Sequence, residues 1–167
     1  SVKGQSYSNW QLCIADDAST VKSLKHYLNE LENEEKISVT FRDENGHISA
    51  ATNSALSLAS GEFVSFLDHD DKLHPHALAT VVAYLNKHKE LDILYSDEDK
   101  IDEYGNRREP FFKPEWSPDL LLSQNYTCHL SVYRKALIDK LKGVREGTEG
   151  AQDYDLIIRA TEQTEKI

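Results

Sequence analysis

Acidic side chains follow one apolar stretch of the chain closely enough to act on a common ligand. The segment from Gly61 to Pro75 has the sequence GEFVSFLDHDDKLHP, in which Asp68, Asp70 and Asp71 come directly after an apolar run. Carboxylates this close repel one another unless a cation or hydrogen bonds hold them, and Mg²⁺ is usually bound by one or two carboxylates together with substrate phosphates. The spacing therefore indicates a metal site. A solvated acidic loop that caps the next helix is the alternative, since Asp favours turns and helix N-termini.

Carboxylates also follow two other apolar stretches. Asp16 and Asp17 come after WQLCIA, and the sequence DED from Asp97 to Asp99 comes after LDILY. The DED sequence has the same spacing as Asp68 and Asp70 and is a rival metal site. We favour the earlier pair, because an apolar strand precedes it and a helix that begins near a proline follows it.

Three histidines and two cysteines offer other ligand chemistry. His69, His74 and His76 could suggest zinc, but a zinc site needs a tetrahedral set of ligands from convergent positions. Because His74 and His76 flank a proline at a predicted helix start, we expect them to be exposed. Cys13 and Cys128 lie far apart within apolar stretches and are predicted to be reduced packing residues, which fits a reducing compartment.

The elements that must position these side chains alternate in type over the first hundred residues. Alternating or continuous apolar runs predict strands over residues 10–15, 38–42, 63–67 and 91–95. Apolar residues at helical spacing, or small residues, predict helices over 19–33, with Ser19 as the cap, 48–59 and 77–87. This alternation predicts a mostly parallel sheet with right-handed crossovers and a ligand site at the carboxyl ends of its strands, with the strand before Asp68 buried on both faces.

The rhythm changes after Ser96. The sequence predicts a hairpin over 101–108, a short helix at 120–123, a strand over 126–133, a helix over 135–141 and an amphipathic last helix over 153–163. Between the hairpin and the short helix runs the aromatic loop FFKPEWSPD. Its residues Phe111, Phe112 and Trp116 could stack on a sugar ring or cover the edge of the sheet. Glycines 143, 147 and 150 mark a loop before the last helix.

Size and charge limit the class of protein. A chain of 167 residues is long enough for one domain with a sizeable core. The formal net charge of −10 opposes nonspecific binding to nucleic acid or to an anionic membrane surface. No apolar run approaches the roughly 18 residues of a membrane span, so the sequence predicts none. We expect a cytoplasmic protein, either free or at the cytoplasmic face of the membrane.

Five sequence motifs together resemble one enzyme family, the nucleotide-sugar-dependent glycosyltransferases of family 2, which have the GT-A fold. In chain order the motifs are IADDAS, SAATNSALSLASGEFVSFLDHDD, YSDEDKID, FKPEWSPDLLLSQNY and EGAQDYDLIIR. The resemblance covers nearly the whole chain and is greatest to rhamnosyltransferase-like members that build bacterial surface polysaccharides. It implies one domain over residues 1–167, with a nucleotide-binding part at about 10–100 and an acceptor-side part at about 101–167.

The resemblance also implies roles for individual residues. Asp17 would hydrogen-bond the base of a UDP- or dTDP-linked sugar donor, and its alternative role is that of a helix cap. Asp68 and Asp70 match the D-x-D motif, whose last Asp binds the Mn²⁺ or Mg²⁺ that bridges the donor diphosphate. Asp153 matches the catalytic base, which would deprotonate a hydroxyl of a saccharide or lipid-linked acceptor, so that the transfer inverts the anomeric centre. Asp97, Trp116 and Gln152 would lie on the acceptor side.

The position of Asp153 predicts its pKa. A carboxylate at a helix start feels the positive end of the helix dipole, which predicts a pKa below the usual range and an ionised group at neutral pH. A cap of the last helix is the alternative role of this residue.

The sequence departs from the family pattern in several places. Gln152 stands where Glu often precedes the base, and His47 stands where some relatives have an Arg that contacts phosphate. The first strand of the family, which lies in the middle of its sheet, and a late His that often completes the metal shell are both absent from the printed sequence. The pattern thus predicts a chain truncated at both ends.

Two other classes of protein share part of this pattern. A phosphoacceptor receiver domain would use Asp16, Asp17, Asp68 and Lys100 as its acidic pocket and lysine, but it has no use for the segment from Glu149 to Asp155. A metal-dependent phosphohydrolase would share the carboxylates and the cation. The reaction products distinguish the hydrolase from a glycosyltransferase, since a hydrolase releases phosphate and a transferase releases a nucleoside diphosphate.

Overall fold

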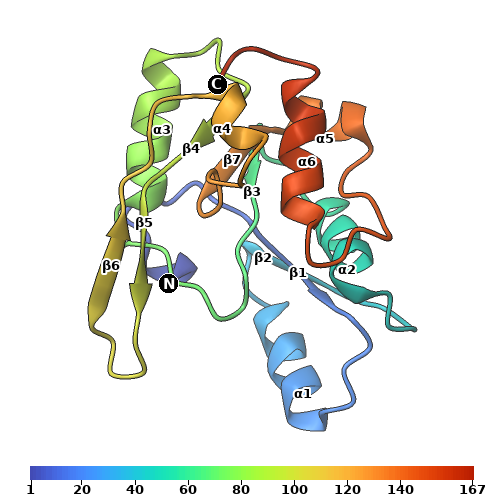
Figure 1. The fold of residues 1–167 in the computed structure, drawn as a ribbon. Helices are drawn as coiled ribbons and strands as arrows, with labels where there is room; N and C mark the ends of the chain where they lie inside the picture. Colours follow the sequence, from blue (N-terminus) through green and yellow to red (C-terminus); the bar gives the residue numbers. More distant parts are fainter.

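The computed structural model describes residues 1–167 and has a mixed α/β architecture (Figure 1). The strands are β1 (Leu12–Asp16), β2 (Ile37–Phe41), β3 (Phe63–Ser65), β4 (Ile93–Tyr95), β5 (Glu98–Ile101), β6 (Arg107–Phe111) and β7 (Ser131–Arg134). The helices are α1 (Lys22–Leu31), α2 (His47–Leu56), α3 (Ala77–Lys87), α4 (Pro118–Leu121), α5 (Lys135–Leu141) and α6 (Gln152–Thr161), and a 3₁₀ turn covers Val2–Gly4.

The strands pair in three small sheets. β1 and β2 form a parallel pair, which is joined by α1 in the manner expected for a βαβ unit. In the second sheet β7 lies between β3 and β4 and is antiparallel to both, so β3 and β4 run in the same direction. β5 and β6 form the third sheet, an antiparallel hairpin that confirms the antiparallel element predicted near 100–133.

Most predicted elements are present, but several bounds differ. β3 covers only Phe63–Ser65, its apolar residues are half-buried and Leu67 is exposed, so this strand is not buried on both faces. The predicted strand over 126–133 is regular only in β7, and the residues before it have irregular backbone. Ser19 does not cap α1, whose N-cap is Val21.

The main core lies between the β3–β7–β4 sheet and helices α4, α5 and α6. Ile93 of β4, Ile138 of α5 and Ile157 of α6 are fully buried within it. The predicted apolar face of the last helix is confirmed, because Leu156, Ile157 and Ala160 all belong to this cluster. Smaller clusters join α3 to β7 and α1 to the β1–β2 pair.

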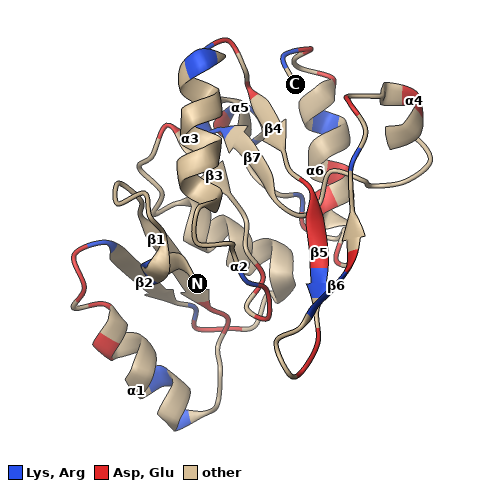
Figure 2. Ribbon diagram, turned by 90° about the vertical axis from the view of Figure 1, so that its left-hand side faces the viewer, with Lys and Arg blue, Asp and Glu red and all other residues tan.

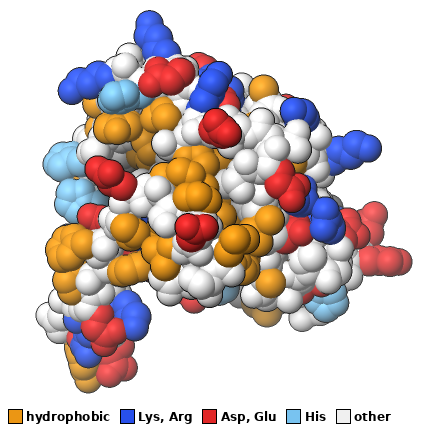
Figure 3. Space-filling model, turned by 45° about the horizontal axis from the view of Figure 1, so that its top comes forward, with side chains coloured by type: hydrophobic (Ala, Val, Ile, Leu, Met, Phe, Trp, Pro, Cys, Tyr) orange, Lys and Arg blue, Asp and Glu red, His pale blue; other side chains and the backbone are white.

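Two parts of the chain project from this body. The β5–β6 hairpin extends away from it (Figures 1 and 3), and α1 lies at the far end of the β1–β2 pair. The exposed surface of 10545 Å² accordingly exceeds the about 8,400 Å² expected of a compact 19.0 kDa monomer. No helix has both the length and the apolar character to cross a membrane.

Candidate active site

Two loops meet at one end of the β3–β7–β4 sheet and carry a compact group of polar side chains. Asp68 and Asp71 lie on the loop that leaves β3, and His129 lies just before β7. Because β3 and β7 are antiparallel neighbours, with Ser65 opposite Val132, the end of β3 and the start of β7 lie side by side. His129 Nε2 is 3.6 Å from Asp68 Oδ2 and 3.9 Å from Asp71 Oδ2.

This group fits a divalent cation. One donor atom each from Asp68, Asp71 and His129 lie within 4.8 Å of one another. Carboxylate oxygen and imidazole nitrogen are both donors that divalent metals accept in proteins. Of the predicted pair, Asp68 belongs to this group and Asp70 does not, since the side chain of Asp71 takes that place.

Asp153 lies close to this group, at the second position of α6. Its half-buried carboxyl has a pKa raised by burial, while the nearby His129 lowers that pKa and Asp68 raises it further. The predicted depression of the pKa by the helix start is therefore wrong, because burial disfavours the ionised carboxylate and raises its pKa. The predicted alternative role as a cap is also wrong, since the N-cap is Ala151 and no side chain caps this helix.

The side chain of Gln152 orients Asp153. Its Oε1 accepts a hydrogen bond of 2.7 Å from the Gly150 amide, and its Nε2 donates one of 3.3 Å to Asp153 Oδ2. Gln152 is itself buried, so this amide is a fixed partner for the carboxylate. Asp155, two residues along the helix, is held by Arg145 at 3.0 Å and Arg159 at 2.7 Å.

Asp17 is anchored at the end of β1. Its Oδ1 accepts a hydrogen bond of 2.8 Å from Arg42 Nε, and both carboxylate oxygens accept from the Gly46 amide, at 3.0 and 3.2 Å. Asp16 is buried and accepts a hydrogen bond from the Ser19 amide. Asp17 thus has a fixed position without capping α1.

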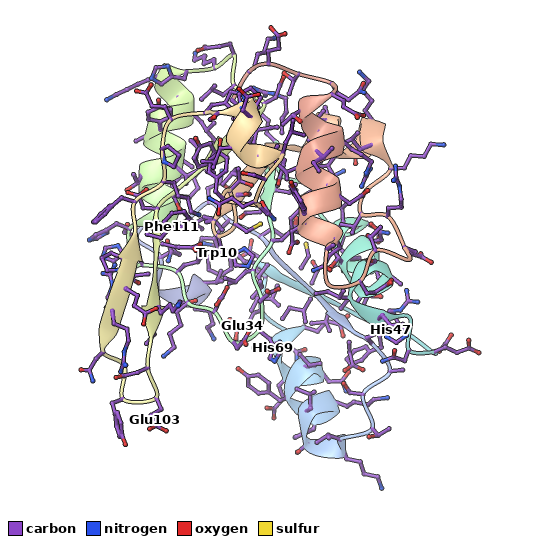
Figure 4. The ribbon with its side chains drawn as sticks, viewed as in Figure 1. Trp10, Glu34, His47, His69, Glu103 and Phe111 are labelled. Atoms are coloured by element: carbon purple, nitrogen blue, oxygen red, sulfur yellow. The ribbon has the colours of Figure 1, made fainter.

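His47 begins α2 and lies apart from the metal-binding group. Its backbone has a φ of 61°, and its side chain is exposed. Figure 4 shows His47 at the start of α2, well separated from His69 on the loop after β3. Backbone amides of Glu149 and Gly147 hold the pKa of the Glu149 carboxyl below its usual range, and His47 adds to this effect, so His47 faces the glycine loop before α6.

The rival metal site at 97–99 is not assembled. Asp97 accepts a hydrogen bond from the Lys113 amide, Glu98 pairs with the Lys113 ammonium and Asp99 pairs with Arg107. Figure 2 shows these acidic residues along β5, with basic residues beside them in the hairpin. The carboxylates of this segment are therefore used to hold the hairpin and the aromatic loop.

The three histidines considered as a zinc set do not converge on one point. His74 and His76 are exposed, as predicted, and contact each other, with His76 Nδ1 2.9 Å from Ser6 Oγ. His69 is not grouped with them or with any other set of potential ligands. Both cysteines are free, as predicted, and burial raises the pKa of Cys128 to about 11.

The aromatic residues of the loop over 111–119 differ in exposure. Trp116 is half-buried and packs on the main core, and the centroid of its ring is 6.3 Å from that of Tyr126. Phe112 is 76% exposed and Phe111 is 38% exposed. Trp116 therefore covers the core, while Phe112 presents an open ring to solvent.

The sequence did not single out three residues that the structure brings to this site. They are His129, Lys113 and Glu98, and each depends on contacts between distant segments. Only the pairing of β7 between β3 and β4 reveals that the residues before β7 reach Asp68. A recess of about 490 Å³ lies elsewhere, between the C-terminal ends of α5 and α6, and none of the predicted site residues lines it.

Comparisons with known proteins agree on the family. The family model described as "Glycosyl transferase family 2" matches residues 1–142. The chain is 44% identical to the O-antigen biosynthesis protein RfbC of Myxococcus xanthus, over all of this chain and 13% of that protein. It is 46% identical to the uncharacterized protein y4gI of Sinorhizobium fredii, over 99% of this chain and 18% of that protein. It thus spans less than a fifth of these two relatives.

A solved structure and a further sequence relative agree with this assignment. A crystal structure of residues 1–349 of S. aureus TarS superposes with a TM-score of 0.74 and 24% identity, over 95% of this chain and 48% of that one. The putative glycosyltransferase EpsE of Bacillus subtilis is 30% identical over 98% of this chain and 60% of its own length.

The strands, their flanking helices and the acidic group at their ends define a domain of the GT-A class. The chain belongs to glycosyltransferase family 2.

Proposed function

We propose that this chain binds a nucleoside diphosphate sugar, UDP- or dTDP-linked, and transfers the sugar to a saccharide or lipid-linked acceptor. We infer that the transfer depends on Mn²⁺ or Mg²⁺ and inverts the anomeric centre. Family membership supports sugar transfer. The relative named for O-antigen biosynthesis, and the relative named putative colanic acid biosynthesis glycosyl transferase WcaA, support a place in the synthesis of surface polysaccharide.

The observation that carries the proposal is the position of Asp153 next to Asp68 and His129. A base that activates an acceptor hydroxyl must lie near the anomeric carbon, and that carbon is bonded to the donor diphosphate. A group that could hold a cation, together with a half-buried carboxylate at the start of α6, would provide both requirements in one place.

The individual roles follow from the chemistry of each side chain. Asp153 would accept the proton of the acceptor hydroxyl, with Gln152 holding one carboxylate oxygen on the acceptor side. Asp68 would hold the cation, either with Asp70, the partner that the D-x-D motif implies, or with Asp71 and His129, whose donor atoms lie beside its own. A divalent cation supplies Lewis acidity that stabilises the leaving diphosphate.

Residues farther from the cation complete the assignment. Asp17 would contact the nucleobase, and His47 would contact a phosphate of the donor. Asp97 and Trp116 would border the acceptor. The nucleotide-binding part would then lie within about 10–100 and the acceptor part within 101–167, and the enzyme would work in the cytoplasm, at or near the membrane face where lipid-linked acceptors lie.

A panel of nucleoside diphosphates tests the proposal through the thermal stability of the chain. A ligand present at 100 times its dissociation constant stabilises the native state by about 2.7 kcal/mol, which raises Tm by roughly 5–11 °C for a chain of this size. We expect UDP or dTDP to give such a shift with Mn²⁺ and a much smaller one with EDTA. Equal shifts with and without the cation would contradict the cation requirement, and release of inorganic phosphate from the donor would identify a hydrolase instead.

A further inference from the structure

A lysine ammonium is enclosed beneath the candidate active site. The side chain of Lys113, which follows β6, is only 1% exposed. Its Nζ lies 3.2 Å from Glu98 Oε2 and donates hydrogen bonds to the carbonyl oxygens of His129, at 2.9 Å, and Thr127, at 3.5 Å. An ammonium group this far from water needs such partners, because burial of an unpaired charge is very unfavourable.

The partners of Lys113 are concentrated on the segment that carries His129. Glu98 Oε2, besides pairing with Lys113, accepts a hydrogen bond from the backbone amide of His129. The amide and the carbonyl of His129 are thus held by the two members of one ion pair. Since His129 itself lies outside the strands, these contacts supply the hydrogen bonds that a regular strand would give to its backbone.

The ion pair is difficult to explain by stability alone. The side chain of Glu98 keeps 36% of its surface exposed, so the cost of the pair comes mainly from desolvation of the Lys113 charge, and such a cost often offsets the attraction between the two charges. A fixed donor and a fixed acceptor do, however, specify the position of a backbone segment. Here that segment places the His129 imidazole between Asp68 and Asp71.

We propose that the Lys113–Glu98 ion pair is a positioning device for His129, which it holds at the distance from Asp68 and Asp71 that a shared divalent cation requires. This inference rests on the cation site of the proposed function. Lys113 and Glu98 do not touch the cation or the substrate in this arrangement. They act through the backbone of His129. The imidazole nitrogen of this residue would then join the carboxylates of Asp68 and Asp71 as a third ligand.

Replacement of Lys113 by Met tests the device, because Met keeps the length of the side chain and removes its charge and donors. Loss of groups that orient metal ligands typically weakens metal affinity about 10–100-fold. We expect Lys113→Met to raise the Mn²⁺ dissociation constant, measured by calorimetry, by a factor in that range. Lys100→Met is the matched control, because Lys100 is exposed on the same hairpin and pairs only with Glu109. The Mn²⁺ affinity of this variant should differ from that of the wild type by less than about twofold.

The ring of His129 gives a second readout that needs no cation. In protein with ¹⁵N-labelled histidine, Asp68→Asn should shift the ring nitrogen resonances of His129 when Lys113 is present and leave them nearly unchanged in the Lys113→Met background. If Lys113→Met retains both the Mn²⁺ affinity and this response, the proposal is wrong. If the wild-type chain binds no Mn²⁺, the cation part of the proposed function fails, and the ring resonances still decide whether Lys113 positions His129.

Circular dichroism checks that the variants fold. If Lys113→Met does not fold, Glu98→Gln takes its place, since glutamine keeps an oxygen that can accept from the His129 amide and removes only the charge of the pair. We expect the same direction of change in Mn²⁺ affinity and in the ring response. A Glu98→Gln variant that matches the wild type in both would overturn the proposal.

Discussion

Replacement of Asp153 by Asn separates the chemical role of this carboxyl from its structural role. Asparagine has almost the same shape, and its side-chain oxygen can still accept the hydrogen bond from Gln152 Nε2. It cannot take a proton from an acceptor hydroxyl. The substitution therefore removes the proposed base and leaves its surroundings in place.

The expected loss of transfer follows from the size of general base catalysis. A positioned base contributes about 10²–10⁴ in rate, or roughly 2.7–5.5 kcal/mol of transition-state stabilisation. No neighbouring carboxyl on the helix can replace Asp153, because Asp155 is paired with Arg145 and Arg159. We expect kcat to fall by that factor, with nucleotide and Mn²⁺ affinities nearly unchanged.

The thermal stability of Asp153→Asn should rise although its kcat falls. Burial raises the pKa of Asp153 from its usual value of 3.8, so the folded state disfavours the ionised form. The stability associated with the neutral carboxyl is fully present below pH 3.8 and is lost as the pH rises through the folded-state pKa. Asp153→Asn should therefore raise Tm at pH 7 relative to the wild type, and this difference should vanish below pH 3.8.

Asp155→Asn is the matched control on the same helix. It loses charged hydrogen bonds to Arg145 and Arg159 that contribute about 2 kcal/mol, so Tm should fall by roughly 4–8 °C. Its specific transfer rate, measured well below Tm, should stay within about threefold of the wild type.

The assay combines transfer kinetics, nucleotide affinity and thermal unfolding on both variants. Transfer by Asp153→Asn at the wild-type rate would remove this residue from the mechanism. A fall in Tm at pH 7 would show that the ionised carboxyl is stabilised by its surroundings and would refute the argument from burial.

Three further substitutions test other parts of the structure. In Mn²⁺ titrations monitored by Tm, Asp70→Ala should abolish the nucleotide-dependent shift if the D-x-D assignment is right, whereas loss on Asp71→Ala with retention on Asp70→Ala would assign the cation to the group seen here. Asp17→Asn should weaken nucleoside diphosphate binding about tenfold or more, as expected for loss of a charged hydrogen bond, while the response to Mn²⁺ alone persists; equal loss of both would place Asp17 at the cation. Gly143→Ala should lower stability by more than about 1 kcal/mol in denaturant unfolding, because φ is +74° and a Cβ would lie 2.3 Å from Asn53 Oδ1; an unchanged midpoint would contradict the strain.

The sequence by itself determined the local elements and the family. Apolar periodicity located the helices to within a few residues because burial of one helix face requires it, as Leu156 and Ile157 in α6 show. Runs of carboxylates directly after apolar strands pointed to Asp17 and Asp68 as candidates, and the resemblance to the family pointed to Asp153. Turn residues placed the hairpin, since Gly105 adopts the positive φ that such a turn requires.

The tertiary structure alone decided which of these side chains meet. The order β3–β7–β4 joins the loop after Ser65 to the segment before Ser131, and nothing in the local sequence of either specifies that pairing. The environment of Asp153 was likewise invisible, because the loss of solvent that raises its pKa comes from packing of distant segments rather than from its helix. For the same reason the sequence did not single out Lys113, although the fold encloses its ammonium with Glu98 and the carbonyl of His129.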